Sequence, residues 1–173
     1  MRVEIEAKVN EDNIKKLMEN DFPVIDINKG ILMQEQIHKA SQNLDSLGGI
    51  IECAVYGLPA GIGDPMFDGI ENNISKAIFA IPAVKGIEFG NGFSCADLKG
   101  SENNDAFYVE NNKVLTKTNN HGGILGGISS GMPLIVKVAL KATPSIGIEQ
   151  DSVNLSQMKN EKLRINGRHD PCI

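Results

Sequence analysis

The sequence predicts an α+β fold, a mixture of helices and strands without the regular strand–helix–strand rhythm of a doubly wound sheet. Three patterns support this prediction. Apolar residues recur every three or four positions in two stretches, alternate with polar residues in a third, and form a nearly uninterrupted β-branched run from Pro133 to Leu140. The 173 residues, 41% of them hydrophobic, suffice for one sizeable core, so we expect a single domain over residues 1–173.

The first third of the chain predicts two helices and a strand. Residues 12–19 carry a short amphipathic pattern that Phe22-Pro23 ends. Apolar residues then recur at helical spacing from Met33 to Leu47, and Gly48-Gly49 predicts the end of that helix. Alternation from Ile51 to Tyr56 is typical of a strand with one buried face.

A further helix is predicted from residue 68 to 81. Asp68 and Glu71 have the spacing of an N-cap residue and its partner, and isoleucines follow on one face up to Ile81. Pro82 ends this helix, and residues 84–89 predict a strand.

The region from Gly90 to Asn120 is polar and predicts at most a hairpin around Asn111-Asn112. After a glycine-dense stretch, residues 133–140 predict a well-buried strand that leads into a turn at 141–145.

Composition excludes several classes of function. The net charge of -5 argues against a nucleic-acid partner, because neutralising a phosphate backbone takes a basic face. No apolar run reaches the roughly 18 residues that span a bilayer, so we expect a cytoplasmic protein without a membrane partner. The three cysteines are far apart and lack CxxC spacing, which predicts neither disulfides nor a structural metal site.

The glycine-dense stretch, Gly122 to Gly131, offers backbone amides that an anionic ligand could approach. It is not a Walker A loop, because Met132 stands where lysine would be required. The triplets at 61–63 and 90–92 lack the third glycine of a dinucleotide-binding fingerprint. A tight turn with close strand packing is the alternative explanation of the glycines.

Two other groups of residues carry candidate chemistry. Lys141, Thr143 and Ser145 alternate with small residues directly after the buried strand, and they would either bind a phosphate or flavin edge or cap a turn. Near the end of the sequence, Arg168 could hold an anion and Asp170 could exchange a proton, with Gly167 and Pro171 constraining the backbone. A surface role is the alternative.

These motifs together resemble chorismate synthase, specifically its C-terminal half. The resemblance runs from about Leu44 to Ile173 and is carried by five segments in order: residues 57–68, 83–88, 122–131, 141–145 and 167–172. It implies an enzyme that converts 5-enolpyruvylshikimate 3-phosphate to chorismate by a 1,4-anti elimination of phosphate. Reduced FMN is required, and the family fold is a sandwich of helices between antiparallel β-sheets that assembles into a homotetramer.

The resemblance also implies roles for individual residues. The FMN contacts would be Pro82, Ala83, Gly126, Lys141, Ala142, Thr143, Pro144, Ser145 and Arg168, where Pro82 replaces an asparagine common in relatives. Asp170 matches the catalytic aspartate, which works with the flavin in removing the ring proton of the substrate. Arg168 would lie between flavin and substrate, so that Arg168 and Asp170 both contact the substrate.

The family's N-terminal half and its final helix have no counterpart in these residues, so we expect a fragment that is inactive alone. Phosphate release by the isolated chain, with substrate and reduced FMN, would contradict this expectation. Two other functions remain open: a non-catalytic phosphate- or flavin-binding module, and a structural fragment that self-associates through exposed edges.

Overall fold

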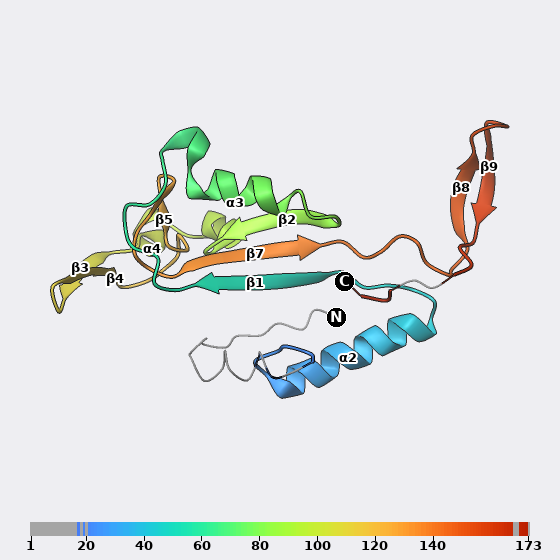
Figure 1. Cartoon of the computed structure of the whole chain (residues 1–173), viewed down its shortest axis with the longest axis horizontal. Helices are drawn as coiled ribbons and strands as arrows, with labels where there is room; N and C mark the ends of the chain where they lie inside the picture. The colour runs from blue at the N-terminus through green and yellow to red at the C-terminus, as the bar shows by residue number, and fades with distance from the viewer. Residues whose placement is uncertain (1–16, 18, 20, 168–169, 173) are drawn as a thin grey trace. The chain divides into compact units, whose positions relative to one another are not determined.

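The chain divides into two units in the computed structural model, which describes residues 17, 19, 21–167 and 170–172. The first unit comprises residues 1–49 and 142–173, and the second comprises residues 50–141. Helices and strands are labelled as in Figure 1. The first unit holds α2 (Ile27–Gln42) and the hairpin of β8 (Gln150–Asn154) and β9 (Lys159–Leu163).

The second unit contains the remaining elements, and β1 begins one residue before it. These elements are β1 (Gly49–Val55), η1 (Met66–Asp68), α3 (Ile70–Ile78), β2 (Val84–Phe89), η2 (Gly92–Asp97), α4 (Gly100–Asn103), β3 (Phe107–Glu110), β4 (Lys113–Thr116), β5 (Ile124–Leu125), β6 (Ile128–Ser129) and β7 (Leu134–Leu140).

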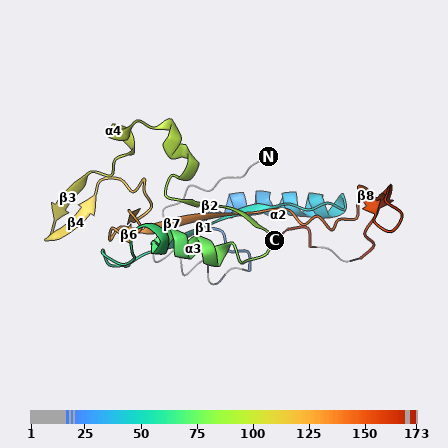
Figure 2. The same cartoon turned by 90° about the horizontal axis from the view of Figure 1, so that it is seen from above.

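A three-stranded sheet of order β1-β7-β2 forms the centre of the second unit. The pair β2 and β7 is antiparallel, with Ile87 opposite Val138, and the arrows of β1 and β7 also point in opposite directions in Figure 1. Helix α3 packs against one face of the sheet through Ile70, Ile74 and Ile78 (Figure 2). The buried core comprises Ile70, Val84, Ile124, Leu134, Val136 and Val138. The α+β prediction and the predicted strands over 84–89 and 133–140 are confirmed.

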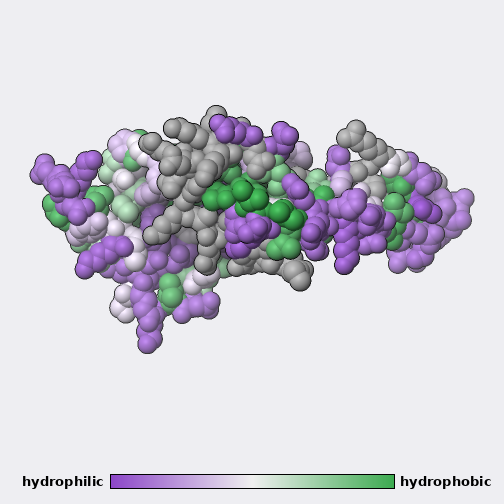
Figure 3. Space-filling view, turned by 90° about the horizontal axis from the view of Figure 1, so that it is seen from below, coloured by the Kyte–Doolittle hydropathy of each residue, from purple (hydrophilic) through white to green (hydrophobic). Residues whose placement is uncertain are grey.

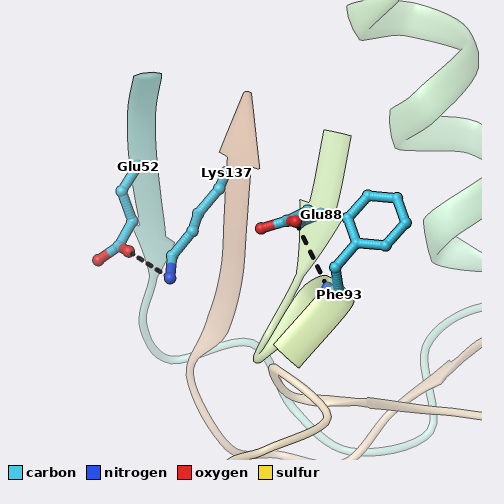
Figure 4. A network of polar contacts seen from close by, with 4 residues as sticks. All are labelled: Glu52, Glu88, Phe93 and Lys137. Atoms are coloured by element: carbon cyan, nitrogen blue, oxygen red, sulfur yellow. Dashed lines mark hydrogen bonds and ion pairs between the residues drawn. The ribbon is translucent and has the colours of Figure 1, made fainter. Parts of the chain in front are cut away.

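The prediction that the strand following Gly49 buries one face is wrong. Ile50 and Ile51 are both more than half exposed in β1. The physical reason is that α3 covers the sheet over β2 and β7, which supply Val84, Leu134, Val136 and Val138 to the core, whereas β1 contributes no residue to it. Its Glu52 meets Lys137 of β7 at 3.4 Å (Figure 4). Because both side chains are substantially solvated, this ion pair contributes at most about 1 kcal/mol.

The predicted helix over Met33–Leu47 is shifted in the structure. Helix α2 begins at Ile27, where the Asp26 side chain accepts a hydrogen bond from the Lys29 amide at 3.1 Å, and it ends at Gln42. Leu44 already has a left-handed backbone, with φ of 59°, so the helix stops well before Gly48-Gly49. The apolar spacing continues past the helix because Leu47 forms a β-bridge with Cys172 instead.

The helix predicted over 68–81 is shorter than expected at both ends. Asp68 lies in η1 and is not the cap; the N-cap position is occupied by Gly69, which has no side chain to accept a capping hydrogen bond. The Ile70 amide donates instead to the Gly127 carbonyl at 2.9 Å. At the other end α3 stops at Ile78, so Ile81 lies in the following turn.

The polar region contains the predicted hairpin and two short helices that the sequence did not suggest. Strands β3 and β4 pair across Asn111 and Asn112, which have φ of 49° and 59°, as a primed two-residue turn requires. Helices η2 and α4 precede this hairpin, and the hairpin β8–β9 was likewise not predicted. Glu88 accepts a hydrogen bond from the Phe93 amide at the start of η2 (Figure 4).

Asp105 organises the chain around this polar region. The residue is 5% exposed, and its carboxylate accepts hydrogen bonds from the Thr118 hydroxyl (2.6 Å) and from the amides of Asn120 (2.8 Å) and His121 (3.0 Å). Burial alone would raise the pKa of Asp105. The hydrogen bonds from Thr118, His121 and Asn120, together with the charge of His121, outweigh burial and hold this pKa below its ordinary value.

We therefore expect Asp105→Asn to lower the free energy of unfolding at pH 7 by about 1–3 kcal/mol, since an amide cannot accept all three hydrogen bonds. A lowered folded-state pKa stabilises the protein above the unfolded-state pKa of about 4, and this contribution disappears as the pH falls through the folded-state value. Urea unfolding from pH 7 to pH 3 should show the two proteins converging at acidic pH. Asp97→Asn, at an exposed position in η2, is the control; an equal loss there, or a constant difference across pH, would contradict this prediction.

Large hydrophobic side chains are exposed at many positions, including Met66, Phe67, Phe93, Leu155 and Met158. Figure 3 shows hydrophobic residues at the surface among hydrophilic ones.

Within the described residues, we find no helix with the length and apolar character that a bilayer crossing requires.

Candidate flavin site

Three of the predicted contact residues meet where β2 begins and β7 ends. Pro82 and Ala83 are the central residues of a turn from Ile81 to Val84, and Ala83 has φ of 70°. Proline followed by a positive φ is the pattern of a type II turn, in which a residue other than glycine or asparagine carries strain. The Ala83 carbonyl accepts a hydrogen bond from the Lys141 amide at 2.9 Å. This contact brings Pro82, Ala83 and Lys141 together in one unit.

Gly126 lies in a tight turn of the glycine-dense stretch. Gly126 and Gly127 connect β5 to β6 with φ of 60° and 84°, values that suit a primed hairpin turn. A side chain built on Gly126 would meet no atom within 4 Å. The backbone there is therefore open to a ligand, and glycine is needed for its conformation.

Gly127 has a different role, because it packs against backbone on both sides. A Cβ at this position would lie 2.5 Å from the Asp64 carbonyl oxygen and 3.0 Å from the Gly69 Cα. The Gly127 carbonyl also receives the first amide of α3. The structure thus shows the turn and the close packing that were the alternative explanation of the glycines, while Gly126 alone keeps an open face.

The other unit contains the next part of the predicted site, Ala142–Ser145. The Thr143 carbonyl accepts a hydrogen bond from the Ser46 hydroxyl at 2.6 Å, and the Pro144 carbonyl accepts from Gln150 Nε2 at 3.0 Å. Ser145 is exposed and Thr143 is half-buried. A short segment after α2 therefore holds the turn that sequence analysis singled out.

The segment after α2 also contacts Pro171, the residue next to the catalytic candidate Asp170. The Leu47 amide donates to the Pro171 carbonyl at 2.8 Å, directly after Asp170, which is exposed. Arg168, predicted to contact both flavin and substrate, and His169 lie outside the described residues. Sequence analysis missed Ser46, because apolar spacing placed it inside a helix; the polar pair Asp45-Ser46 between leucines was the available signal.

Two hollows lie in the second unit. The larger, about 620 Å³, is lined mainly by apolar residues of the β3–β4 and β5–β6 hairpins. A smaller hollow of about 160 Å³ includes Glu71, Asn103 and His121. Neither has a predicted contact residue among those that line it. Across residues 21–167 and 170–172, no three His, Cys, Asp or Glu side chains gather as metal ligands.

Comparison with known proteins identifies the family. A family model described as Chorismate synthase matches residues 1–173. The chain belongs to the chorismate synthase family. A chorismate synthase of Dehalococcoides mccartyi (strain BAV1) is 49% identical over 164 residues, which cover 95% of this chain and 45% of the relative. One from Thermococcus gammatolerans is 51% identical over 141 residues, covering 82% of this chain and 40% of that protein.

A solved structure supports the same fold. The crystal structure of a chorismate synthase superposes with a TM-score of 0.71 at 31% identity, over 77% of this chain and 40% of that chain. The chorismate synthase relatives are thus more than twice as long as the region they share with this chain.

Proposed function

We propose that this chain supplies part of the active site that converts 5-enolpyruvylshikimate 3-phosphate to chorismate and phosphate by 1,4-anti elimination. The observation that carries the proposal is that the family-specific segments are held by identifiable contacts within their units: Pro82-Ala83 to Lys141, and both Thr143 and Pro171 to the segment after α2. Family membership supports a lyase of the shikimate pathway of aromatic amino-acid biosynthesis.

The residues present suit a phosphate-bearing flavin. Lys141 is exposed and provides an ammonium group, Ser145 provides an exposed hydroxyl, and Gly126 provides an open backbone. In the proposed complex FMN is held by these three residues together with Pro82, Ala83, Ala142, Thr143, Pro144 and Arg168. Reduced FMN, when bound, would supply electron density as the allylic C–O bond breaks.

The remaining chemistry falls to the chain's own side chains. Arg168 pairs with anionic groups of flavin and substrate and so offsets the charge that develops as phosphate leaves. Asp170 takes up the ring proton as a general base. As further parts of the proposal, the complete protein is cytoplasmic and assembles as a homotetramer, and it acts on a small molecule without a nucleic-acid or membrane partner.

Anaerobic titration of FMN, oxidised and then reduced, tests whether this chain contributes to flavin binding. We expect saturable binding that is tighter for the reduced form. Lys141→Ala should raise the Kd about tenfold or more, because it removes a charge-assisted hydrogen bond to the ligand. Lys76→Ala, on the exposed side of α3, removes the same charge elsewhere and should leave the Kd unchanged. Absence of binding in both redox states, or equal effects of the two variants, would contradict the proposal.

A further inference from the structure

Residues 44–47, here called the post-helix segment, link three distant parts of the first unit. The Leu44 carbonyl accepts from the Gly147 amide at 3.0 Å, and the Leu47 amide donates to the Pro171 carbonyl at 2.8 Å. Between them, the Ser46 hydroxyl donates to the Thr143 carbonyl at 2.6 Å. Four residues therefore fix both the proposed flavin-binding turn and the stretch that follows Asp170.

The side chain of Ser46 is buried, and its hydroxyl makes one hydrogen bond. It is 7% exposed, and a buried hydroxyl needs a partner, which it has in the Thr143 carbonyl. Its own amide donates to the Asp45 carboxylate at 2.8 Å, so the backbone at Ser46 is also held. The Ser46 hydroxyl is therefore held in place where it donates to the Thr143 carbonyl.

The acceptor's position explains why this contact matters. Thr143 precedes Pro144, which has no N–H, so the carbonyl is the only polar atom through which the peptide group between them can be anchored. Its orientation sets the direction of the backbone into Ser145. The next carbonyl, of Pro144, is held by Gln150 Nε2 and by the Ile146 amide, each at 3.0 Å.

We propose that Ser46 is a positioning residue for the proposed elimination. It holds the turn Ala142–Ser145 in the conformation that binds flavin, and the adjoining Leu47 amide ties the same segment to the stretch carrying Asp170. This inference rests on the proposed function, since it gives Ser46 a role only toward that flavin and that carboxylate.

The test combines flavin affinity with amide hydrogen exchange on the chain. Ser46→Ala should raise the Kd for reduced FMN about fivefold to tenfold, the effect of one lost hydrogen bond. It should also speed exchange at the amides of Thr143 and Ser145. Ser46→Thr, which keeps the hydroxyl, should restore both values and the absorbance spectrum of bound flavin. Ser41→Ala, at an exposed position of α2, is the matched control and should change neither.

A second variant covers the case in which Ser46→Ala does not fold, as judged by circular dichroism. Gln150→Ala removes an exposed hydrogen bond to the same turn and should weaken reduced FMN about twofold to threefold. If Ser46→Ala folds and binds flavin with wild-type affinity, the positioning role is overturned and the proposed function stands. If Ser46→Ala is unfolded, wild-type flavin affinity in Gln150→Ala has the same meaning. A wild-type chain that binds no flavin would overturn the proposed function as well.

Discussion

Replacing Gly127 by alanine should lower the free energy of unfolding by at least about 3 kcal/mol. Two independent costs add. Gly127 has φ of 84°, a conformation that costs an alanine about 1 kcal/mol or more. Its new Cβ would also lie 2.5 Å from the Asp64 carbonyl oxygen, which is backbone and cannot rotate away. Displacement of that junction would further weaken the hydrogen bond from Ile70 that starts α3. Urea unfolding at pH 7 measures the effect.

Two other glycines separate the two costs. Gly126 has φ of 60° but open space around it, so Gly126→Ala should lose only about 1 kcal/mol. Gly100 in α4 is open and has no positive φ, so Gly100→Ala should be neutral or slightly stabilising. If Gly127→Ala proved no worse than Gly126→Ala, backbone crowding at this junction would not be the cause.

Asp170→Asn should reduce the turnover number about 10²- to 10⁴-fold, because an amide cannot accept the ring proton. The assay is anaerobic phosphate release from 5-enolpyruvylshikimate 3-phosphate with reduced FMN. A suitable protein is the Dehalococcoides mccartyi relative in which the 164 matched residues are replaced by those of this chain. We expect the Kd for reduced FMN to stay within about twofold, since the substitution keeps the size of the side chain.

Asp151→Asn provides the control for this measurement. Asp151 lies in β8, forms an exposed ion pair with Lys162, and should tolerate the change with full turnover. Turnover within about threefold of wild type for Asp170→Asn would assign the proton to another group. Unchanged flavin affinity in a chimera that never releases phosphate would favour the binding-module alternative.

Local patterns predicted much of the second unit. The isoleucine spacing indicated α3, residues 84–89 and the β-branched run indicated β2 and β7, and Asn111-Asn112 indicated the β3–β4 turn. These elements were predictable because their periodicity reflects burial against a neighbour along several residues. The short helices η2 and α4 and the hairpin β8–β9 have no comparable pattern, since they bury little and depend on caps and turns.

Element ends were set by contacts that the local sequence does not contain. Apolar spacing favoured a helix through Leu47, but Leu47 pairs with Cys172, so the chain leaves the helix at Asn43. Asp68 had the residue type of a cap, but the Gly127 carbonyl, more than fifty residues away, receives the first amide of α3. In both places a long-range partner outweighed a local preference of about 1 kcal/mol.

By itself the sequence determined the α+β class, the principal strands of the second unit and the family, because these depend on residue types and their spacing along the chain. The residues of the candidate flavin site stay a prediction, which rests on motifs in the order that the family has them. Only the tertiary structure decided that Gly127 supports a helix start while Gly126 stays open, and that Ser46 holds Thr143 across 97 positions of sequence. Such contacts follow from how the folded chain brings distant backbone groups within hydrogen-bonding distance, and no pattern of neighbouring residues encodes that distance.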